Sequence, residues 1–264
     1  MTLRAGGVSK PPFDTMNLGS RVGDRPESVA RNRELFRSAI PARTVLLNQA
    51  HGVHAVVLTS ETENGVEADA CVTREPGVAC CILVADCLPM LFTNRQGSAV
   101  AAAHAGWRGL AGTDGRGVVE STYLAFRAAV LAAGQQHRSA LGEVALDTVA
   151  AQTQVWLGPC IGPSAFEVGD EVRRAFVLHD AAAAALFRPG RPGKFHADLQ
   201  GLARQRLAAL GITRVHGNDG ATDWCTYSDR SRFFSHRRDQ LALGGSGRMA
   251  AAVWLNASQS QPNT

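Results

Sequence analysis

Three phrases carry the strongest structural signals in this chain: LLNQAHGVH (46–54), VADCLPM (84–90) and AAAHAGWRG (101–109). Each follows or closes an apolar run of the kind that forms a β-strand. Each also supplies one side chain that binds soft or borderline metal ions, namely His51, Cys87 and His104. If these strand ends converge, the three side chains would bind one divalent ion and leave a coordination position open, as in a catalytic zinc site.

The run VACCILV at 78–84 predicts a central strand, because nearly every position is apolar and a strand buried on both faces has this pattern. Buried central strands commonly present their carboxyl ends to a ligand, and here that end carries Asp86 and Cys87. The other predicted strands are 43–47, 54–59, 70–73, 90–93, 99–103, 155–157, 212–215 and 249–255. Helices are predicted at 25–38, with Asp24 as its cap, at 117–133, from 170 through 187, where RPGRPG ends it, and at 196–210.

Composition favours a globular protein of the cytoplasm, with 45% hydrophobic and 19% charged residues. The net charge of +4 comes from scattered arginines, which fits an anionic small substrate better than nucleic acid. No apolar run is long enough for a membrane span. Six cysteines without CxxC spacing, and no secretory signal, predict reduced thiols. We expect a monomer with one catalytic domain at 1–256 and a disordered polar tail at 257–264.

The three metal-binding side chains leave alternatives open. Cys87 could be one more small buried hydrophobe, or a nucleophilic thiolate activated by His51 or His104, with Asp86 nearby. Two histidines and one cysteine also form the core of a blue-copper centre. A multicopper laccase, however, uses many histidines in H-x-H pairs, whereas the eight histidines here are dispersed and form no such pair. A structural zinc in a binding protein is the non-enzymatic alternative.

Further blocks extend along nearly the whole chain. They are AGGVSKPPFDTMNLGSRVGD (5–24), NQAHGVHAVVL (48–58), ADCLPMLF (85–92), AAAHAGWRGL (101–110), GPCIGPSAFEVGDEV (158–172), DLQGLARQRLAALGI (198–212), CTYSDRSRFFSHRRD (225–239) and GRMAAAVWL (247–255). Through these ordered blocks the chain resembles the YfiH-like family, long labelled multicopper polyphenol oxidases or laccases and now associated with purine nucleoside phosphorylase activity. Departures are small: Cys160 stands where many relatives have Ala, and His236 where Tyr is frequent.

The resemblance implies an α+β fold, a four-layer α/β/β/α sandwich with mixed sheets in a single domain. It implies a catalytic Zn²⁺ held by His51, Cys87 and His104, which match the family's Q-x-H-G, A-D-C-L-P and A-H-A-G-W-R blocks. The implied activities are cleavage of adenosine, inosine, guanosine and methylthioadenosine with phosphate, and deamination of adenosine to inosine. Cu²⁺ with a phenol, or a hydrolase acting on a cell wall precursor, is the alternative.

Side chains around the three ligands complete the predicted site. Arg108 is expected to orient phosphate or a ribose hydroxyl, and Asp86 to carry a proton. Asn48, Gln49 and Cys225 are the candidate substrate contacts, although Asn48 and Gln49 could equally bond to loop backbone. The remaining polar residues are expected to be structural: His54, the turn residues Ser228 and Asp229, and a surface ion-pair cluster of Arg237, Arg238 and Asp239.

Overall fold

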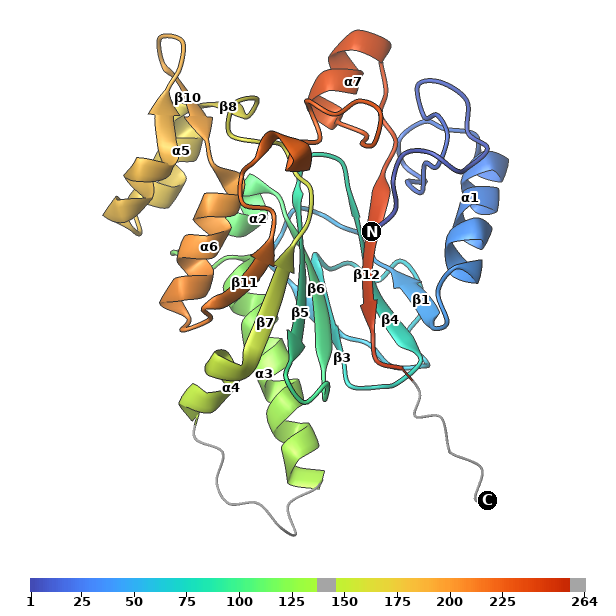
Figure 1. Ribbon diagram of the computed structural model, residues 1–264, viewed down its shortest axis with the longest axis vertical. Coiled ribbons are helices and arrows are strands. Elements are labelled where there is room, and N and C mark those ends of the chain that lie inside the picture. The colour runs from blue at the N-terminus through green and yellow to red at the C-terminus, as the bar shows by residue number, and fades with distance from the viewer. Residues whose placement is uncertain (137–145, 257–264) are drawn as a thin grey trace.

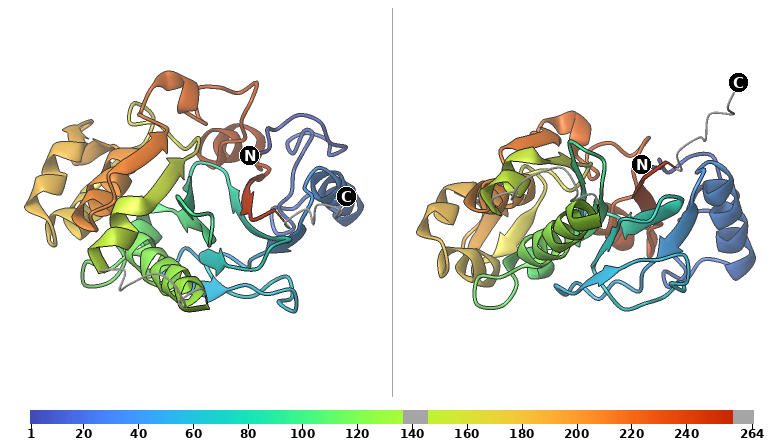
Figure 2. Two further views of the ribbon diagram at one scale, coloured as in Figure 1. Left: turned by 60° about the horizontal axis from the view of Figure 1, so that its bottom comes forward. Right: turned by 90° about the horizontal axis from the view of Figure 1, so that it is seen from below.

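The computed structural model describes residues 1–136 and 146–256, so the predicted tail at 257–264 lies outside the described residues. These residues form one α+β domain of four layers, in which helix α1 covers one sheet, a second sheet faces the first, and further helices cover the second (Figures 1 and 2). This arrangement confirms the predicted fold class. No helix within the described ranges is long and apolar enough to cross a membrane.

The smaller of the two main sheets contains three strands in the order β1-β4-β12. Strand β4 lies in the middle, parallel to β1 and antiparallel to β12. Its side chains alternate between two apolar layers: Cys80 faces the larger sheet and Cys81 faces helix α1. Burial on both faces explains the continuous apolar run and confirms the predicted strand. The bounds are β1 Arg43–Leu46, β4 Val78–Val84, β12 Met249–Trp254 and α1 Pro26–Ser38.

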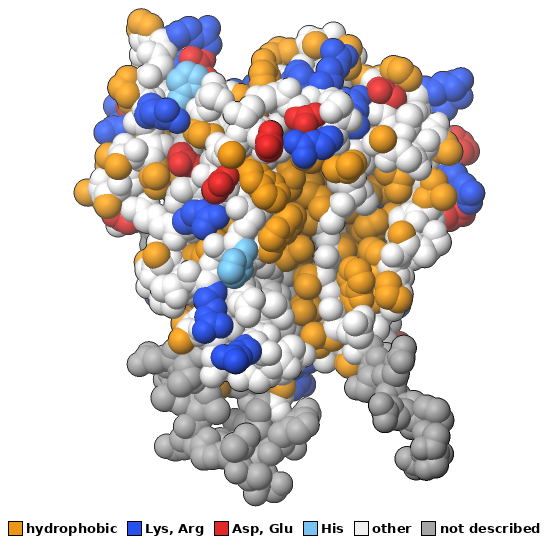
Figure 3. All heavy atoms as spheres, viewed as in Figure 1, with side chains coloured by type: hydrophobic (Ala, Val, Ile, Leu, Met, Phe, Trp, Pro, Cys, Tyr) orange, Lys and Arg blue, Asp and Glu red, His pale blue; other side chains and the backbone are white. Residues whose placement is uncertain are grey.

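The larger sheet contains six strands in the order β11-β7-β5-β6-β3-β2. The β5–β6 hairpin forms its centre, and alternate alanines of β6 face the helices or the smaller sheet. Apolar side chains gather between β7 and β12 on the face that Figure 3 shows. The bounds are β2 Ala55–Val57, β3 Ala70–Thr73, β5 Leu88–Asn94, β6 Val100–Ala105, β7 Thr153–Leu157 and β11 Arg214–Gly217.

Helices α3 and α6 cover the outer face of the larger sheet (Figure 1). A small antiparallel sheet, β8-β10-β9, lies beside them with α5. The bounds are α2 Trp107–Ala111, α3 Val118–Gln136, α4 Leu146–Gln152, β8 Glu167–Gly169, α5 Asp170–Val177, β9 Phe187–Pro189, β10 Lys194–Ala197, α6 Leu199–Ala209, α7 His236–Leu243, and the short 3₁₀ helices η1 Ala181–Leu186 and η2 Thr222–Trp224.

Three predictions about helices were wrong. The helix predicted to start at His196 begins at Leu199, because His196 belongs to strand β10 and Asp198 caps the helix through the amide of Gly201. The helix that begins at Asp170 ends at Val177, and Asp180 caps a separate 3₁₀ turn, because its side chain accepts a hydrogen bond from the amide of Ala182. RPGRPG then closes the β9–β10 hairpin instead of simply ending a helix. Asp24 does not cap α1: its carboxylate accepts hydrogen bonds from Ser9 and Asn17. Proline in the first turn of α1 fixes the start of that helix without a side-chain cap.

Candidate functional site

The segment 85–87 connects β4 of the smaller sheet directly to β5 of the larger one. Asp86 adopts a left-handed backbone conformation in this short crossing, with φ of 83°. Such a φ is uncommon for a residue other than glycine and often marks a functional or constrained position. The crossing places the thiol of Cys87 between the two sheets, beside the loop that carries His51 and the end of β6 that carries His104.

Asp69 holds the two histidines in place and was missed by the sequence analysis. Its buried carboxylate accepts hydrogen bonds from three consecutive backbone amides, those of Ala50, His51 and Gly52, at 2.6–3.1 Å. The same carboxylate lies 2.8 Å from Nδ1 of His104. This contact directs Nε2 of His104 to the other side, which is the usual way a carboxylate orients a metal-binding imidazole. The signal for Asp69 was an acid directly before an apolar strand.

The three predicted ligands come together. One side-chain ligand atom from each of His51, Cys87 and His104 can be chosen so that all three lie within 4.8 Å of one another. The Cys87 Sγ lies 3.8 Å from Nε2 of His51, and the two imidazole rings lie edge to face with centroids 4.7 Å apart. Gly106 leaves the space beside them, because a Cβ there would lie 2.9 Å from Cδ2 of His51 and 3.1 Å from the thiol.

The electrostatics of this cluster favour a thiolate. Burial acts to raise the pKa of Cys87, but the positive charge of His104 and hydrogen bonds from both histidines outweigh it and lower the pKa to about 6. Burial acts to lower the pKa of His104, whereas the Cys87 thiolate and the hydrogen bond to Asp69 raise it to about 9. For Asp69, hydrogen bonds from His104 and Gly52 overcome the effect of burial and lower the pKa. Without a metal, therefore, the cluster holds a thiolate–imidazolium pair.

Asp86 serves a different part of the structure. Its carboxylate accepts hydrogen bonds from the hydroxyls of Thr226 and Ser235 and from the backbone amide of Arg237, at 2.6–3.1 Å. These bonds tie the start of helix α7 to the β4–β5 crossing. The predicted role of Asp86 as a proton carrier remains a prediction, and three donors already engage its two oxygens.

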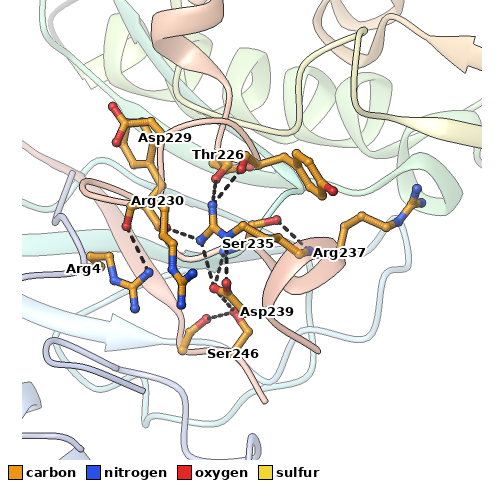
Figure 4. Close-up of polar contacts among 12 residues, drawn as sticks. Arg4, Thr226, Asp229, Arg230, Ser235, Arg237, Asp239 and Ser246 are labelled. Atoms are coloured by element: carbon orange, nitrogen blue, oxygen red, sulfur yellow. Dashed lines mark hydrogen bonds and ion pairs between the residues drawn. The ribbon is translucent and has the colours of Figure 1, made fainter. Parts of the chain in front are cut away.

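The residues next to Asp86 form a buried cluster, not the surface ion-pair cluster that was predicted. Arg238 bonds to both carboxylate oxygens of Asp239, which is 1% exposed, and to the carbonyls of Thr226, Tyr227 and Phe233. Figure 4 shows Ser246 beside Asp239, while the side chain of Arg237 points away from both. Arg237 belongs instead to the cleft described next.

A cleft of about 610 Å³ opens above the His51–Cys87–His104 cluster. Among the described residues that line it, Asp86 is the only acidic one, and its charge is engaged as above. Basic side chains from distant segments surround the opening, so the cleft favours a negatively charged ligand. They are Arg21, Arg33, Arg108, Arg237, Arg248 and His236. An apolar wall is formed by Ile161, Phe166 and Leu199 together with Trp107.

The other predicted contacts divide between the cleft and the protein interior. Arg108 is exposed at the cleft and stacks on the Trp107 ring at 4.4 Å, and Asn48 lines the cleft beside Arg21, which donates to its side-chain oxygen. The amide of Gln49 is occupied by the backbone N–H and C=O of Leu83, at 2.7 and 2.8 Å. This arrangement matches the predicted structural alternative for Gln49.

Cys160 and Cys225 are buried and lie outside the cleft lining. This position corrects the expected substrate contact for Cys225. The Cys225 sulfur accepts hydrogen bonds from the amide of Gly162 and the hydroxyl of Ser228. Cys160 packs against Gln200 and Asn218, and its burial raises the pKa of its thiol. Asp229 caps a turn through Ser231 and Arg232.

Comparison with known proteins gives consistent results. The family model described as multi-copper polyphenol oxidoreductase laccase matches residues 1–256. A protein of Pseudomonas aeruginosa named purine nucleoside phosphorylase is 44% identical over 256 residues, covering 97% of this chain and 92% of its own length. The purine nucleoside phosphorylase YfiH of Escherichia coli is 44% identical over 254 residues, covering 96% and 91%.

Solved structures show the same fold. The crystal structure of a Neisseria meningitidis protein is 40% identical and superposes with a TM-score of 0.82, covering 97% of this chain and 93% of its own. YlmD from Geobacillus stearothermophilus, 27% identical, gives a TM-score of 0.76 over 97% and 90%.

Fold and cleft together define a single-domain α+β sandwich with a His-Cys-His cluster at the crossing between its sheets. More specifically, the chain belongs to the multi-copper polyphenol oxidoreductase laccase family, in which its relatives include YfiH.

Proposed function

We propose that this protein is a zinc-dependent purine nucleoside phosphorylase that cleaves adenosine, inosine, guanosine and methylthioadenosine with phosphate, and that also deaminates adenosine. The observation that carries the proposal is the position of the His51–Cys87–His104 cluster at the base of a basic cleft. Relatives named purine nucleoside phosphorylase, 44% identical over nearly the whole chain, support the reaction class.

The donor set fits a zinc ion. Two imidazoles and one thiolate are ligands that Zn²⁺ prefers, and three protein ligands are typical of a catalytic site. Zinc bond lengths of about 2.0 and 2.3 Å place tetrahedral N and S ligands about 3.5 Å apart, and the thiol lies 3.8 Å from Nε2 of His51. When bound, the ion would polarise an oxygen of the substrate or activate water, and its net positive charge would hold an anion.

The lining of the cleft suits the two substrates of a phosphorolysis. An oxygen of phosphate forms a bond to C1′ of the ribose while the bond from C1′ to the purine nitrogen breaks, and the departing base takes up a proton. Phosphate requires positive charge, which the arginines around the opening supply. The purine requires an apolar surface, which Phe166, Ile161 and Trp107 offer in the same cleft.

Arg108 is proposed to act at the boundary between these regions. Its guanidinium lies over the Trp107 ring, and helix α2 places both residues directly after the His104 strand. Stacking restricts the guanidinium without using its hydrogen-bond donors. Arg108 can therefore orient phosphate or a ribose hydroxyl close to the cluster.

A cysteine nucleophile is the second candidate, because the pKa of Cys87 is lowered to about 6. In that case the protein would be a hydrolase, for example of a cell wall precursor, and would need no metal. Copper-dependent oxidation of phenols is the third, and rests on the family description. Within the described residues, His51, Cys87 and His104 form the one cluster of three potential ligands, whereas a multicopper oxidase requires several copper sites.

One set of assays separates these candidates. Purified protein is incubated with adenosine with and without phosphate, and the products are analysed for inosine, free base, ribose 1-phosphate and free ribose. Phosphorolysis predicts base and ribose 1-phosphate only when phosphate is present. Elemental analysis identifies the metal, and alkylation of Cys87 in metal-free protein tests the nucleophile. Activity that persists without metal would contradict the zinc-dependent mechanism.

A further inference from the structure

Arg248 is a half-buried cationic side chain of the cleft lining. Like the other arginines of that lining, it forms no ion pair with a carboxylate within residues 1–136 and 146–256. Its own hydrogen bonds go from Nη1 to the backbone carbonyls of Ser246 and Gly247, at 2.9 and 3.0 Å. A half-buried cation that lines a cleft and has no carboxylate partner favours an anionic ligand there.

The position of Arg248 is fixed by the N-terminal segment. The backbone amide of Arg248 donates to Oδ1 of Asn17, and its carbonyl accepts from the amide of Leu18. Gly19 lies directly against the aliphatic part of the side chain, since a Cβ on Gly19 would lie 2.7 Å from Cγ of Arg248. These contacts hold the side chain in one place, so its charge is preorganised before a ligand binds.

The guanidinium lies in the electrostatic field of the His51–Cys87–His104 cluster. Burial lowers the pKa of Arg248, while the negative charges of Cys87 and Asp86 counteract this effect. His236 is close enough that the charge of Arg248, after burial, lowers the pKa of its imidazole. Both side chains line the same cleft as the cluster. Asp86 cannot neutralise Arg248 fully, because three other donors share its carboxylate.

We propose that Arg248, with His236 beside it, forms the subsite that binds the phosphate oxyanion, and that the nucleoside lies against the apolar residues of the cleft. The inference rests on the proposed phosphorolysis for the identity of its ligand. It gives Arg248 the main binding role, and Arg108, which is exposed and stacked on Trp107, a secondary one. Arg33 is less suited, because its Nε and Nη2 already donate to Leu18 and Ser20.

The test measures binding of inorganic phosphate to the metal-loaded protein by calorimetry, apart from turnover. Arg248→Gln should weaken phosphate binding at least about tenfold, because charge-assisted hydrogen bonds are lost. Arg248→Lys, which keeps the charge and most of the packing, should bind severalfold more weakly than wild type, since it lacks the planar fork. Arg31→Gln removes an arginine outside the cleft and is the matched control. Circular dichroism confirms that each variant is folded.

In steady-state assays the same variants should raise the KM for phosphate more than the KM for inosine. Equal phosphate binding by wild type and Arg248→Gln, or no binding by wild type, would overturn the subsite. So would dependence on Arg248 for adenosine 5′-monophosphate but not for inorganic phosphate, which would indicate a nucleotide site. Arg248-dependent phosphate binding without cleavage of any nucleoside would support the subsite and contradict the proposed function. Cleavage of nucleosides by Arg248→Gln with an unchanged KM for phosphate would support the proposed function and contradict the subsite.

Discussion

The floor and the rim of the cleft are built in different ways. The floor consists of His51, Asp69, Cys87 and His104, which lie within 54 positions of one another and at the ends of buried strands. The rim consists of Arg21, Arg33, Arg237 and Arg248, which come from opposite ends of the chain. One buried carboxylate orients the floor, whereas backbone carbonyls and loop contacts hold the rim.

This difference suggests that the floor serves catalysis and the rim serves substrate binding. The floor is preorganised by short, buried hydrogen bonds, as a site that positions a metal or a thiolate requires. The rim presents charge to a cleft open to solvent, where individual contacts contribute less and can adapt to the substrate. Changes in the floor should therefore affect kcat, whereas changes in the rim should mainly affect KM.

The largest effect is expected from removing a ligand of the floor. Cys87→Ala or His51→Ala should abolish metal binding and reduce nucleoside turnover by roughly a thousandfold, since a metal stabilises transition-state charge by several kcal/mol. Metal content by mass spectrometry and inosine phosphorolysis are the measurements. Cys81→Ala, a buried cysteine facing α1, is the control and should affect stability alone. Phosphorolysis that survives loss of the metal would refute the metal-centred mechanism.

Substitutions of Asp69 and Asp86 test the difference between floor and rim more sharply. Asp69→Asn keeps the shape of the side chain but weakens the orientation of His104, so metal affinity should fall about 10- to 100-fold. Asp86→Asn should leave metal affinity nearly unchanged and instead loosen helix α7, which raises the KM for substrates. Competition with a chelator measures metal affinity. Equal loss of metal in both variants would show that floor and rim are one unit.

In the metal-free protein, the low pKa of Cys87 should change its alkylation rate severalfold. The pKa of Cys87 is lowered from 9.0 to about 6, so its thiolate should react with iodoacetamide down to pH 6. The other five cysteines are buried, which makes the reaction specific. At pH 7 the rate should exceed that of an ordinary thiol only severalfold, because a thiolate of lower pKa is also a weaker nucleophile. A midpoint near pH 9 would contradict the thiolate–imidazolium pair.

The same pair affects stability. Because the folded-state pKa of Cys87 is depressed, its contribution is present at high pH and is lost as the pH falls through about 6. Because the pKa of His104 is raised from 6.5, its contribution is present at low pH and is lost as the pH rises through about 9. Between about pH 6 and 9 the Cys87 contribution grows while the His104 contribution declines, so the two largely offset each other. The thermal unfolding temperature of the metal-free protein should therefore change little from this pair across that range.

The sequence predicted the floor better than the rim for physical reasons. Val78–Val84 is apolar throughout because both faces are buried, and this composition could be recognised directly. Cys87 follows that strand closely, His104 lies near the end of β6, and His51 lies in the loop after β1, so local pattern and chemistry coincide. Asp69 could have been identified as well, since an acid directly before a buried strand requires a partner.

The rim has no comparable local signal. Arg33 occurs in a helix that resembles an ordinary exposed one, and the blocks that contain Arg21 and Arg248 carry no local sign that these side chains line a cleft. Only the packing of the N-terminal segment against the β12 region brings these side chains to one opening. The break after Val177 was missed for a related reason: the alanines that follow have high helix propensity, but Asp180 favours a cap over continuation.

The smallest effect is expected for Gln49, which lies in the floor segment but bonds only to backbone. Gln49→Ala removes the two hydrogen bonds that link it to Leu83 and should lower the free energy of unfolding by about 1–3 kcal/mol, because the Leu83 groups lose their partners. The KM for inosine should change less than about threefold, since the hydrogen bonds to Leu83 hold both ends of the amide against the backbone. Chemical denaturation and steady-state kinetics measure the two quantities. A tenfold rise in KM without loss of stability would instead place Gln49 in the substrate site, and would mean that backbone contacts and ligand contacts compete for the same amide.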